Sequence, residues 1–278
     1  MKVIVSHDVD HLYPSDHHFR DLYFPKLYAR SFLEWMKGQC TPGEFFRRCL
    51  LPFRRRLHHI PELLAYDRSL GIPSTFFFGM DNGLGMMYRR ERAKPIMDEL
   101  TEQGVDIGVH GIHFQELPEI RKEYDAFSAL TGRKDFGIRM HYVRRTEDTF
   151  PHLAKAGYLF DSTQFDKTQQ TLAAPYKVGG LWEFPLHIME GYAVPPGKLE
   201  EGKQKTLHLL EKAEAEGLPY LVILFHDVYF DEALYREYTA WYRWLTELLT
   251  AKKLEFVNFR TAIRELEEDA KNGDSNRK

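Results

Sequence analysis

The chain has 278 residues, and 38 Lys and Arg against 41 Asp and Glu give it a formal net charge of −3. Hydrophobic residues make up 43% of the sequence and aromatic residues 14%, enough to fill a substantial core, so extensive disorder is excluded. The near-neutral charge argues against a general nucleic-acid binder, because such proteins are usually strongly basic. This length suits one large domain, and two cysteines are too few for a disulfide framework.

The amino-terminal segment has neither the apolar region nor the small-residue cleavage site of a signal peptide. No apolar run approaches the roughly 18 residues that a membrane-spanning helix needs. From these two features we expect a cytoplasmic protein without a transmembrane segment.

Predicted helices and short apolar strands alternate along the chain, with Gly or Pro at many of the boundaries. The expected strands are 2–6, 72–78, 105–109, 136–138, 157–161, 218–225 and 254–257. The expected helices are 61–70, 92–103, 117–130, 147–156, 203–216 and 232–251. This alternation indicates an α/β fold with a mostly parallel sheet and helical crossovers.

Two regions interrupt the alternation. Residues 12–60 form a long insertion after the first strand, rich in aromatic and arginine residues. Loops of that length without a function are uncommon, so we expect part of the insertion to be helical and to cap one end of the sheet. Residues 269–278 are polar and are expected to form a frayed tail. Because no repeat or linker divides the chain, we expect residues 1–268 to form a single domain.

Polar side chains of the kind that bind metals or transfer protons recur where the predicted strands end. They are Asp8, Asp10, His110, His113, Arg139, Asp161 and His226. In a parallel α/β barrel all these carboxyl ends open on one face, where the active site is built from several strands. The sequence therefore predicts that these residues converge on one pocket.

Asp8 and Asp10 stand two residues apart on the first strand, so both side chains project to the same face. Two carboxylates this close repel each other unless a cation or a shared proton relieves them. One carboxylate with His110 and His113 forms a set that Zn²⁺, Fe²⁺ or Co²⁺ can use. Strand residues three apart point to opposite faces, so His113 joins the set only if Gly111 turns the chain. The simpler alternative is a solvated turn with surface histidines.

Six short motifs follow one another in a fixed order. They are SHDVD at 6–10, GIPSTFF at 71–77, IGVHGIH at 107–113, GIRMHY at 137–142, GYLFDS at 157–162 and LVILFH at 221–226. In this order they resemble the polysaccharide deacetylases of the NodB-homology type, over most of the chain outside the insertion and the tail. The resemblance implies a distorted (β/α)₇ barrel, which agrees with the alternation of helices and strands.

The resemblance also implies a metal-dependent hydrolase that removes an acetyl or other N-acyl group from a sugar. Asp8 matches the general base that acts on water, and Arg139 matches the arginine that holds this base. Asp10, His110 and His113 match the metal ligands. The implied cofactor is a divalent metal, Zn²⁺ in the first place, with Fe²⁺ or Co²⁺ as alternatives.

Three further positions complete the implied site. The backbone N–H of Tyr142 matches the donor to the oxyanion, and His226 matches the acid that protonates the leaving amine. Asp161 is a looser match to an acid that orients His226. In the family the two histidines are usually four residues apart, whereas here they are three apart, so His11 or His141 is an alternative to His113 as the third ligand.

We expect the substrate to be a glycan precursor, such as a lipid-linked or nucleotide-linked sugar of cell-surface polysaccharide or lipopolysaccharide biosynthesis. Two alternatives stay open: a metal-dependent hydrolase of a non-carbohydrate amide, and a glycan-binding or scaffold protein whose site has decayed. Arginines at 47–48 and 54–56 are most simply a solvated face. With the apolar residues of segment 44–56 they could also form an amphipathic surface for peripheral membrane contact.

Overall fold

The computed structural model describes residues 1–18, 20–168 and 171–275. Within them a nine-stranded sheet has the strand order β6-β7-β5-β4-β3-β2-β1-β9-β8. The strands are β1 (Lys2–Val9), β2 (Thr75–Gly79), β3 (Asp106–Gly111), β4 (Ile138–Met140), β5 (Phe160–Asp161), β6 (Tyr176–Val178), β7 (Leu181–Glu183), β8 (Ile188–Met189) and β9 (Tyr220–Leu224). All neighbouring strands are parallel except β6 and β7, as the alternating pattern predicts.

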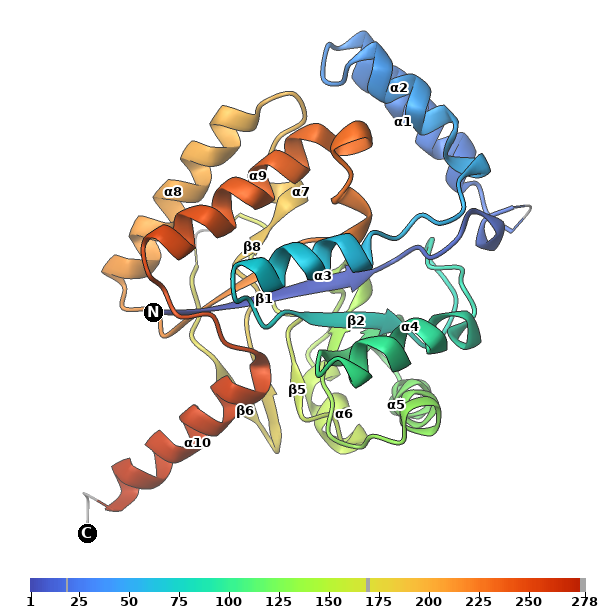
Figure 1. Ribbon diagram of the computed structural model, residues 1–278. Coiled ribbons are helices and arrows are strands. Elements are labelled where there is room, and N and C mark those ends of the chain that lie inside the picture. The colour runs from blue at the N-terminus through green and yellow to red at the C-terminus, as the bar shows by residue number, and fades with distance from the viewer. Residues whose placement is uncertain (19, 169–170, 276–278) are drawn as a thin grey trace.

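Helices lie along the outside of this sheet (Figure 1). Those that connect or follow its strands are α3 (Ile60–Ser69), α4 (Arg90–Glu102), α5 (Leu117–Thr131), α6 (Thr149–Ala156), α7 (Glu190–Ala193), α8 (Leu199–Ala215), α9 (Glu232–Ala251) and α10 (Phe259–Ser275). A parallel bridge between Phe165 and Leu186 joins the segment after β5 to the segment before β8. The sheet therefore curls towards closure, and the predicted distorted (β/α)₇ barrel is confirmed.

The buried aromatic residues of β2 contribute to hydrophobic clusters on both faces of the sheet. β2 is buried along its whole length. Alternate side chains of a strand point to opposite faces, so Phe76 and Phe78 pack beneath the helices while Phe77 points into the barrel. Inside, the rings of Phe160 and Phe259 lie 6.2 and 6.0 Å from that of Phe77. Phe259, the first residue of α10, thus fills the barrel interior.

The insertion contains the helices α1 (Tyr23–Met36) and α2 (Pro42–Cys49), which form a hairpin. The side chain of Thr41 accepts a hydrogen bond from the Glu44 backbone N–H, and the Glu44 side chain accepts one from the Thr41 N–H, which starts α2. The Arg48 Nε donates to the carbonyl oxygen of Leu234 on α9 at 2.9 Å and ties the hairpin to the body. Figure 1 shows the hairpin projecting from the body on the side to which β1 points.

Two of the expected elements differ from the structure, and β6, β7, β8, α7 and α10 were not expected. The predicted strand at 254–257 is reduced to a single bridge between Val3 and Phe256. The polar segment expected as a tail from residue 269 continues α10 as far as Ser275. Residues 276–278 of that expected tail lie outside the described residues. Among the described helices, none combines the length and apolar content needed to cross a bilayer.

Candidate metal-binding active site

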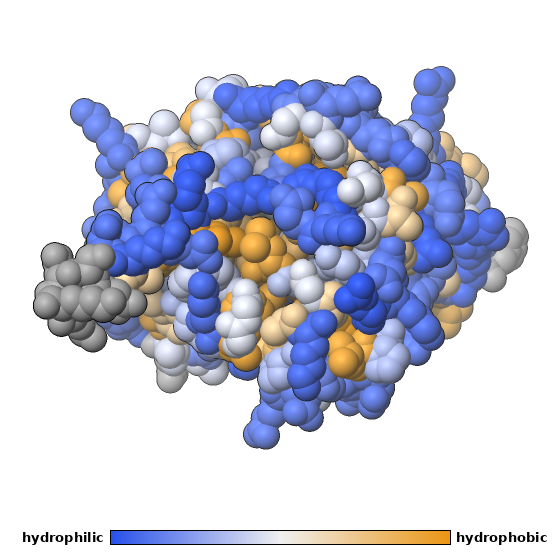
Figure 2. Space-filling model, turned by 90° about the horizontal axis from the view of Figure 1, so that it is seen from below, coloured by the Kyte–Doolittle hydropathy of each residue, from blue (hydrophilic) through white to orange (hydrophobic). Residues whose placement is uncertain are grey.

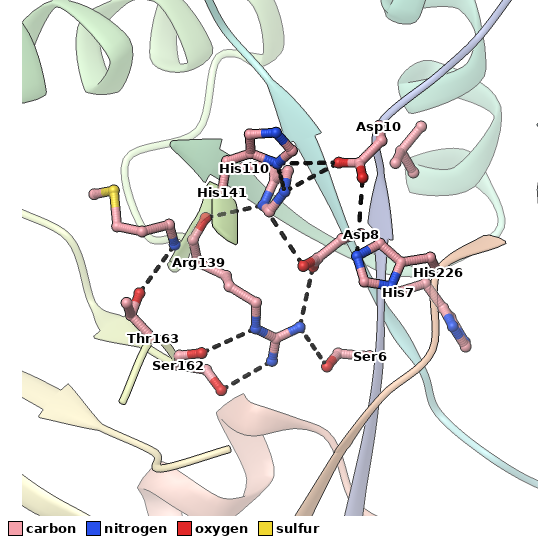
Figure 3. A network of polar contacts seen from close by, with 12 residues as sticks. Ser6, His7, Asp8, Asp10, His110, Arg139, His141, Ser162, Thr163 and His226 are labelled. Carbon is pink, nitrogen blue, oxygen red and sulfur yellow. Dashed lines mark hydrogen bonds and ion pairs between the residues drawn. The ribbon is translucent and has the colours of Figure 1, made fainter. Parts of the chain in front are cut away.

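The strand ends bring most of the predicted residues to one place (Figure 3). Asp8 and Asp10 lie at the end of β1, and His110 lies on β3, where it is in register with Arg139 of β4. His226 lies two residues beyond the end of β9. Because parallel strands share one carboxyl edge, residues from distant parts of the sequence meet here.

Three side chains place ligand atoms around one point: Asp10, His110 and His141. Oδ1 of Asp10 lies 3.2 Å from Nε2 of His110 and 3.3 Å from Nδ1 of His141. The two imidazole nitrogens are 3.0 Å apart. Ligand atoms of a tetrahedral zinc ion lie about 3.3 to 3.6 Å from one another, close to these separations.

The hydrogen bonds around these three residues also suit a cation. Nδ1 of His110 lies 3.0 Å from the carbonyl oxygen of Arg139, which fixes the proton on Nδ1 and leaves Nε2 as the ligand atom. Oδ1 of Asp10 is buried without a hydrogen-bond partner among the described residues. Burial alone would raise the pKa of Asp10, but His141 and His110 hold it well below its usual range, so the carboxylate is ionised. The residues present therefore fit a divalent metal.

The structure does not bring His113 to Asp10 and His110. Its Nε2 lies 2.9 Å from Oδ2 of Asp81, and its side chain is 33% exposed. His141 takes the third position instead, which was one of the two alternatives. The other alternative, His11, faces Nε2 of His17 at 3.1 Å, and burial lowers its pKa to about 3.

Arg139 is fully buried and holds Asp8 in place. Its Nη1 donates to Oδ1 of Asp8 at 3.1 Å and to Oγ of Ser6 at 2.8 Å. Its Nε and Nη2 donate to the carbonyl oxygen and the hydroxyl of Ser162, both at 2.9 Å. A buried guanidinium is costly unless it is fully paired, so this network fixes both the arginine and the carboxylate. Oδ2 of Asp8 lies 3.7 Å from Nδ1 of His110, next to the metal-type trio.

His226 has a carboxylate partner that the sequence did not indicate. Its Nδ1 lies 2.7 Å from Oε1 of Glu190, and its Nε2 lies 3.8 Å from Oδ2 of Asp10. Burial alone would lower the pKa of His226, but Glu190 and the two aspartates raise it to about 10. The imidazole is therefore protonated at neutral pH. Glu190 follows β8 directly, so it obeys the same strand-end rule, but a strand of two residues is too short to recognise in the sequence.

Asp161, predicted to orient His226, has other partners. Its Oδ1 accepts a hydrogen bond from Oγ1 of Thr163 at 2.6 Å, and Thr163 in turn accepts one from the backbone N–H of Met140 at 2.9 Å. Asp161 is in register with Glu183, and both are fully buried. Through Thr163, Asp161 therefore helps to hold the backbone next to Arg139. Glu190, rather than Asp161, pairs with His226.

A cavity of about 990 Å³ opens over the site. Its lining includes the carboxylates of Asp8 and Asp10 and the side chain of Tyr142, whose backbone has a left-handed φ of 59°. The phenol of Tyr142 donates to the carbonyl oxygen of Leu84 at 3.0 Å. One wall comes from the insertion, chiefly α1, and carries Lys26 and Arg30. The insertion therefore borders the candidate site.

No family model matches the chain, and a search of curated proteins finds no match. The solved structures that are similar to this chain include the following two. A proposed polysaccharide deacetylase from Mycobacterium smegmatis has a TM-score of 0.61 at 18% identity, and the match covers 97% of this chain and 90% of that one. A probable polysaccharide deacetylase from Pseudomonas aeruginosa PAO1 has a TM-score of 0.55 at 17% identity, with 74% and 72% covered. The chain thus has the fold of the polysaccharide deacetylases, and the resemblance of the six motifs is confirmed for the fold.

Proposed function

We propose that the protein is a metal-dependent hydrolase that removes an N-acetyl or other N-acyl group from a sugar or polysaccharide precursor. The observation that carries the proposal is the meeting of Asp10, His110 and His141 beside two groups suited to proton transfer. Asp8 adjoins His110, and His226 adjoins Asp10, at 3.7 and 3.8 Å. A base and an acid on the two sides of a metal site are what amide hydrolysis requires.

Asp10, His110 and His141 would hold the metal, for which we propose Zn²⁺, with Fe²⁺ and Co²⁺ as alternatives. A divalent ion there would act as a Lewis acid towards the acyl carbonyl and would make water more acidic. Oxygen and imidazole ligands suit all three ions. His113 is not needed for this ligand set, because His141 supplies the second imidazole.

The side chains of the chain itself handle the protons. Asp8, held by Arg139, accepts a proton from the attacking water. His226, protonated through its pairing with Glu190, donates a proton from Nε2 to the leaving nitrogen. The backbone N–H of Tyr142 is proposed to donate to the oxyanion as the carbonyl becomes tetrahedral. Each residue thus stabilises charge that develops only in the transition state.

The charge and the volume of the cavity favour a substrate that carries an anionic group. Lys26, Arg30 and Lys167 are among its lining residues, and about 990 Å³ exceeds the space that a single sugar ring requires. We propose a lipid-linked or nucleotide-linked sugar of cell-surface polysaccharide or lipopolysaccharide biosynthesis, whose phosphate groups would face these cations. The cytoplasmic location and the single domain of residues 1–268 stay predictions.

The test is acetate or formate release from N-acylated lipid-linked and nucleotide-linked sugars by zinc-loaded protein. Wild-type protein is expected to turn over at least one member of the panel, and Asp8→Asn is expected to be inactive while it still binds metal. A metal-loaded protein that releases acid only from non-carbohydrate amides would replace the sugar proposal with an amidohydrolase. A protein that binds no metal under zinc-replete conditions would overturn the proposal.

A further inference from the structure

Exposed large apolar side chains are concentrated in the insertion. Ten such side chains are exposed in the described part of the chain. Four of them, Leu22, Leu84, Tyr142 and Tyr192, line the cavity. The other six all belong to the hairpin region and are Phe32, Leu33, Met36, Phe46, Leu50 and Phe53. Single exposed apolar residues are ordinary, but a group of this size on one projecting element marks an interaction surface.

Ring contacts join the two helices of the hairpin into one continuous apolar surface. The Phe45 ring of α2 lies 6.2 Å from Phe32 and 5.3 Å from Trp35, both on α1, and 5.3 Å from its neighbour Phe46. Phe53, just beyond α2, is 84% exposed. We call this set, completed by Leu33, Met36 and Leu50, the hairpin surface.

The opposite side of the hairpin is already occupied. Phe24, Leu27 and Leu51 are buried in a small cluster with Leu234 and Tyr235 of α9. The hairpin therefore has two apolar sides, and only one of them packs against the body. The residues on the open side take no part in packing against the body, because Phe24, Leu27 and Leu51 make that contact.

Positive charge accompanies the hairpin surface. Residues 22–56 hold eight Lys and Arg against two Glu, a net charge of +6 in a chain whose total is −3. Both glutamates are engaged within the hairpin, Glu34 with Arg48 and Glu44 with Thr41. Arg47 and Arg55 are exposed, and neither forms an ion pair with another described residue. Their charges are available to an anionic partner.

We propose that this hairpin docks the protein on an anionic lipid bilayer. The apolar side chains of the hairpin surface would enter the boundary between headgroups and acyl chains, and Arg47 and Arg55 would contact lipid phosphates. Apolar residues beside Lys and Arg on a short helical element are the signature of interfacial membrane binding. A second copy of the chain fits less well, because a self-complementary interface would bring two segments of charge +6 together.

The position of the hairpin also favours a lipid bilayer as its partner. Figure 1 shows it as the outermost element on its side of the molecule, so a flat surface can reach it without touching the barrel. Seen from below the view of Figure 1, the molecule is mostly hydrophilic, and apolar atoms appear mainly near the centre of that face (Figure 2). Residues of α1 also line the cavity, so docking would bring the cavity close to the bilayer.

Vesicle flotation tests the proposal without any use of enzymatic activity. Wild-type protein should bind phosphatidylcholine vesicles that contain phosphatidylglycerol, and binding should weaken with added salt. Phe46→Ser with Phe53→Ser should weaken binding about a hundredfold, on the order of tenfold per buried ring. Arg47→Gln with Arg55→Gln should weaken it about 25-fold, at roughly fivefold per charge. Lys134→Gln with Lys155→Gln, exposed cations outside the hairpin, is the matched control and should bind as wild type.

Circular dichroism of each variant shows whether it folds, and Leu33→Ser with Met36→Ser provides a second apolar variant if the first does not. Failure of the wild-type protein to bind phosphatidylglycerol vesicles overturns the proposal, as does equal binding by folded apolar variants. Sedimentation velocity shows whether the protein dimerises. If the wild type forms a dimer but does not bind vesicles, and Phe46→Ser with Phe53→Ser abolishes the dimer, the surface belongs to a second copy instead. Since no substrate is present, none of these outcomes depends on the proposed deacylation.

Discussion

Glu190 and His226 form a carboxylate–imidazole pair with 2.7 Å between Oε1 and Nδ1, although they are 36 residues apart in the sequence. The pair joins the ends of two neighbouring strands, β8 and β9. Carboxylate pairing fixes the orientation of the ring and directs Nε2 towards Asp10, 3.8 Å from its Oδ2. The pairing with Glu190 therefore keeps His226, the proposed acid, protonated and also orients its Nε2.

We predict that Glu190→Gln lowers kcat by roughly a hundredfold, part of the 10²–10⁴ that a positioned acid contributes. KM should change little, because Glu190 acts through His226 and not on bound substrate. Glu190→Asp, which keeps the charge, should recover part of the loss. Steady-state kinetics on an acylated sugar measures both constants, and an effect on KM alone would contradict this role.

The ligand set gives a second prediction. His141→Ala should weaken metal binding at least about a hundredfold, because loss of even an outer partner of a ligand costs 10- to 100-fold. His113→Ala should leave affinity unchanged, since its ring pairs with Asp81. Competition with a fluorescent zinc chelator measures the dissociation constants. The reverse order, with His113→Ala the weaker binder, would restore His113 as the ligand.

Arg139 leads to a prediction about stability. Arg139→Met should lower the free energy of unfolding by about 3–5 kcal/mol, because it leaves the buried Asp8 carboxylate without its cation. Asp8→Asn in the same chain should recover part of that loss, as the buried charge is then gone. Urea denaturation of Arg139→Met, Asp8→Asn, the double variant and the wild type gives the comparison. Additive losses in the double variant would show that the two side chains do not interact.

The buried pair of Asp161 and Glu183 predicts a pH dependence of stability. Burial, followed by the charge of Asp161, raises the pKa of Glu183 well above its usual value, and burial also raises the pKa of Asp161. The folded state therefore keeps protons that the unfolded chain has released above the usual pKa of 4.5. Since the folded state binds more protons, the free energy of unfolding must fall as pH rises from there towards the folded pKa.

Glu183→Gln removes this titration, because glutamine keeps the shape of the neutral acid. Its decline in stability with pH should be shallower by up to about 1.4 kcal/mol per pH unit. Urea denaturation at several values between about pH 5 and pH 8 measures the slopes. Parallel slopes for variant and wild type would mean that Glu183 is already ionised in the folded protein.

The cationic wall of the cavity gives the fifth prediction. Lys26→Gln with Arg30→Gln should raise KM about tenfold for an acylated sugar that carries a diphosphate, at roughly 0.7 kcal/mol for each partly screened charge. KM for a neutral acylated sugar should stay the same, which separates charge recognition from a distorted cavity. An equal change for both sugars would assign these residues to shape alone.

Much of the fold could be predicted because helix punctuation and apolar strands are local signals. The strand-end rule likewise indicated Asp8, Asp10, His110, Arg139 and His226. It missed Glu190 because β8 spans two residues and shows no periodicity. The choice between His113 and His141 depends on where the chain points after β3 and β4, and residue spacing alone does not determine that direction.

The hairpin shows a different limit. The sequence shows its aromatic and basic residues but not which of them are buried, because burial depends on where α9 lies. Leu27 and Leu33 look alike in the sequence, yet one packs on the body and the other is 55% exposed. Only tertiary contacts separate the anchoring side from the open side.

The rings of Phe77, Phe160 and Phe259 also bear on how molecules reach the candidate site. They pack together in the barrel interior, and the Phe77 ring lies 4.8 Å from the guanidinium carbon of Arg139, so the interior is filled next to the site. α1 borders the cavity over Asp10, so in the proposed hydrolysis the substrate would arrive, and both products would leave, beside this helix. The order in which the products leave, and inhibition by the slower one, would then depend on the rim that the insertion builds.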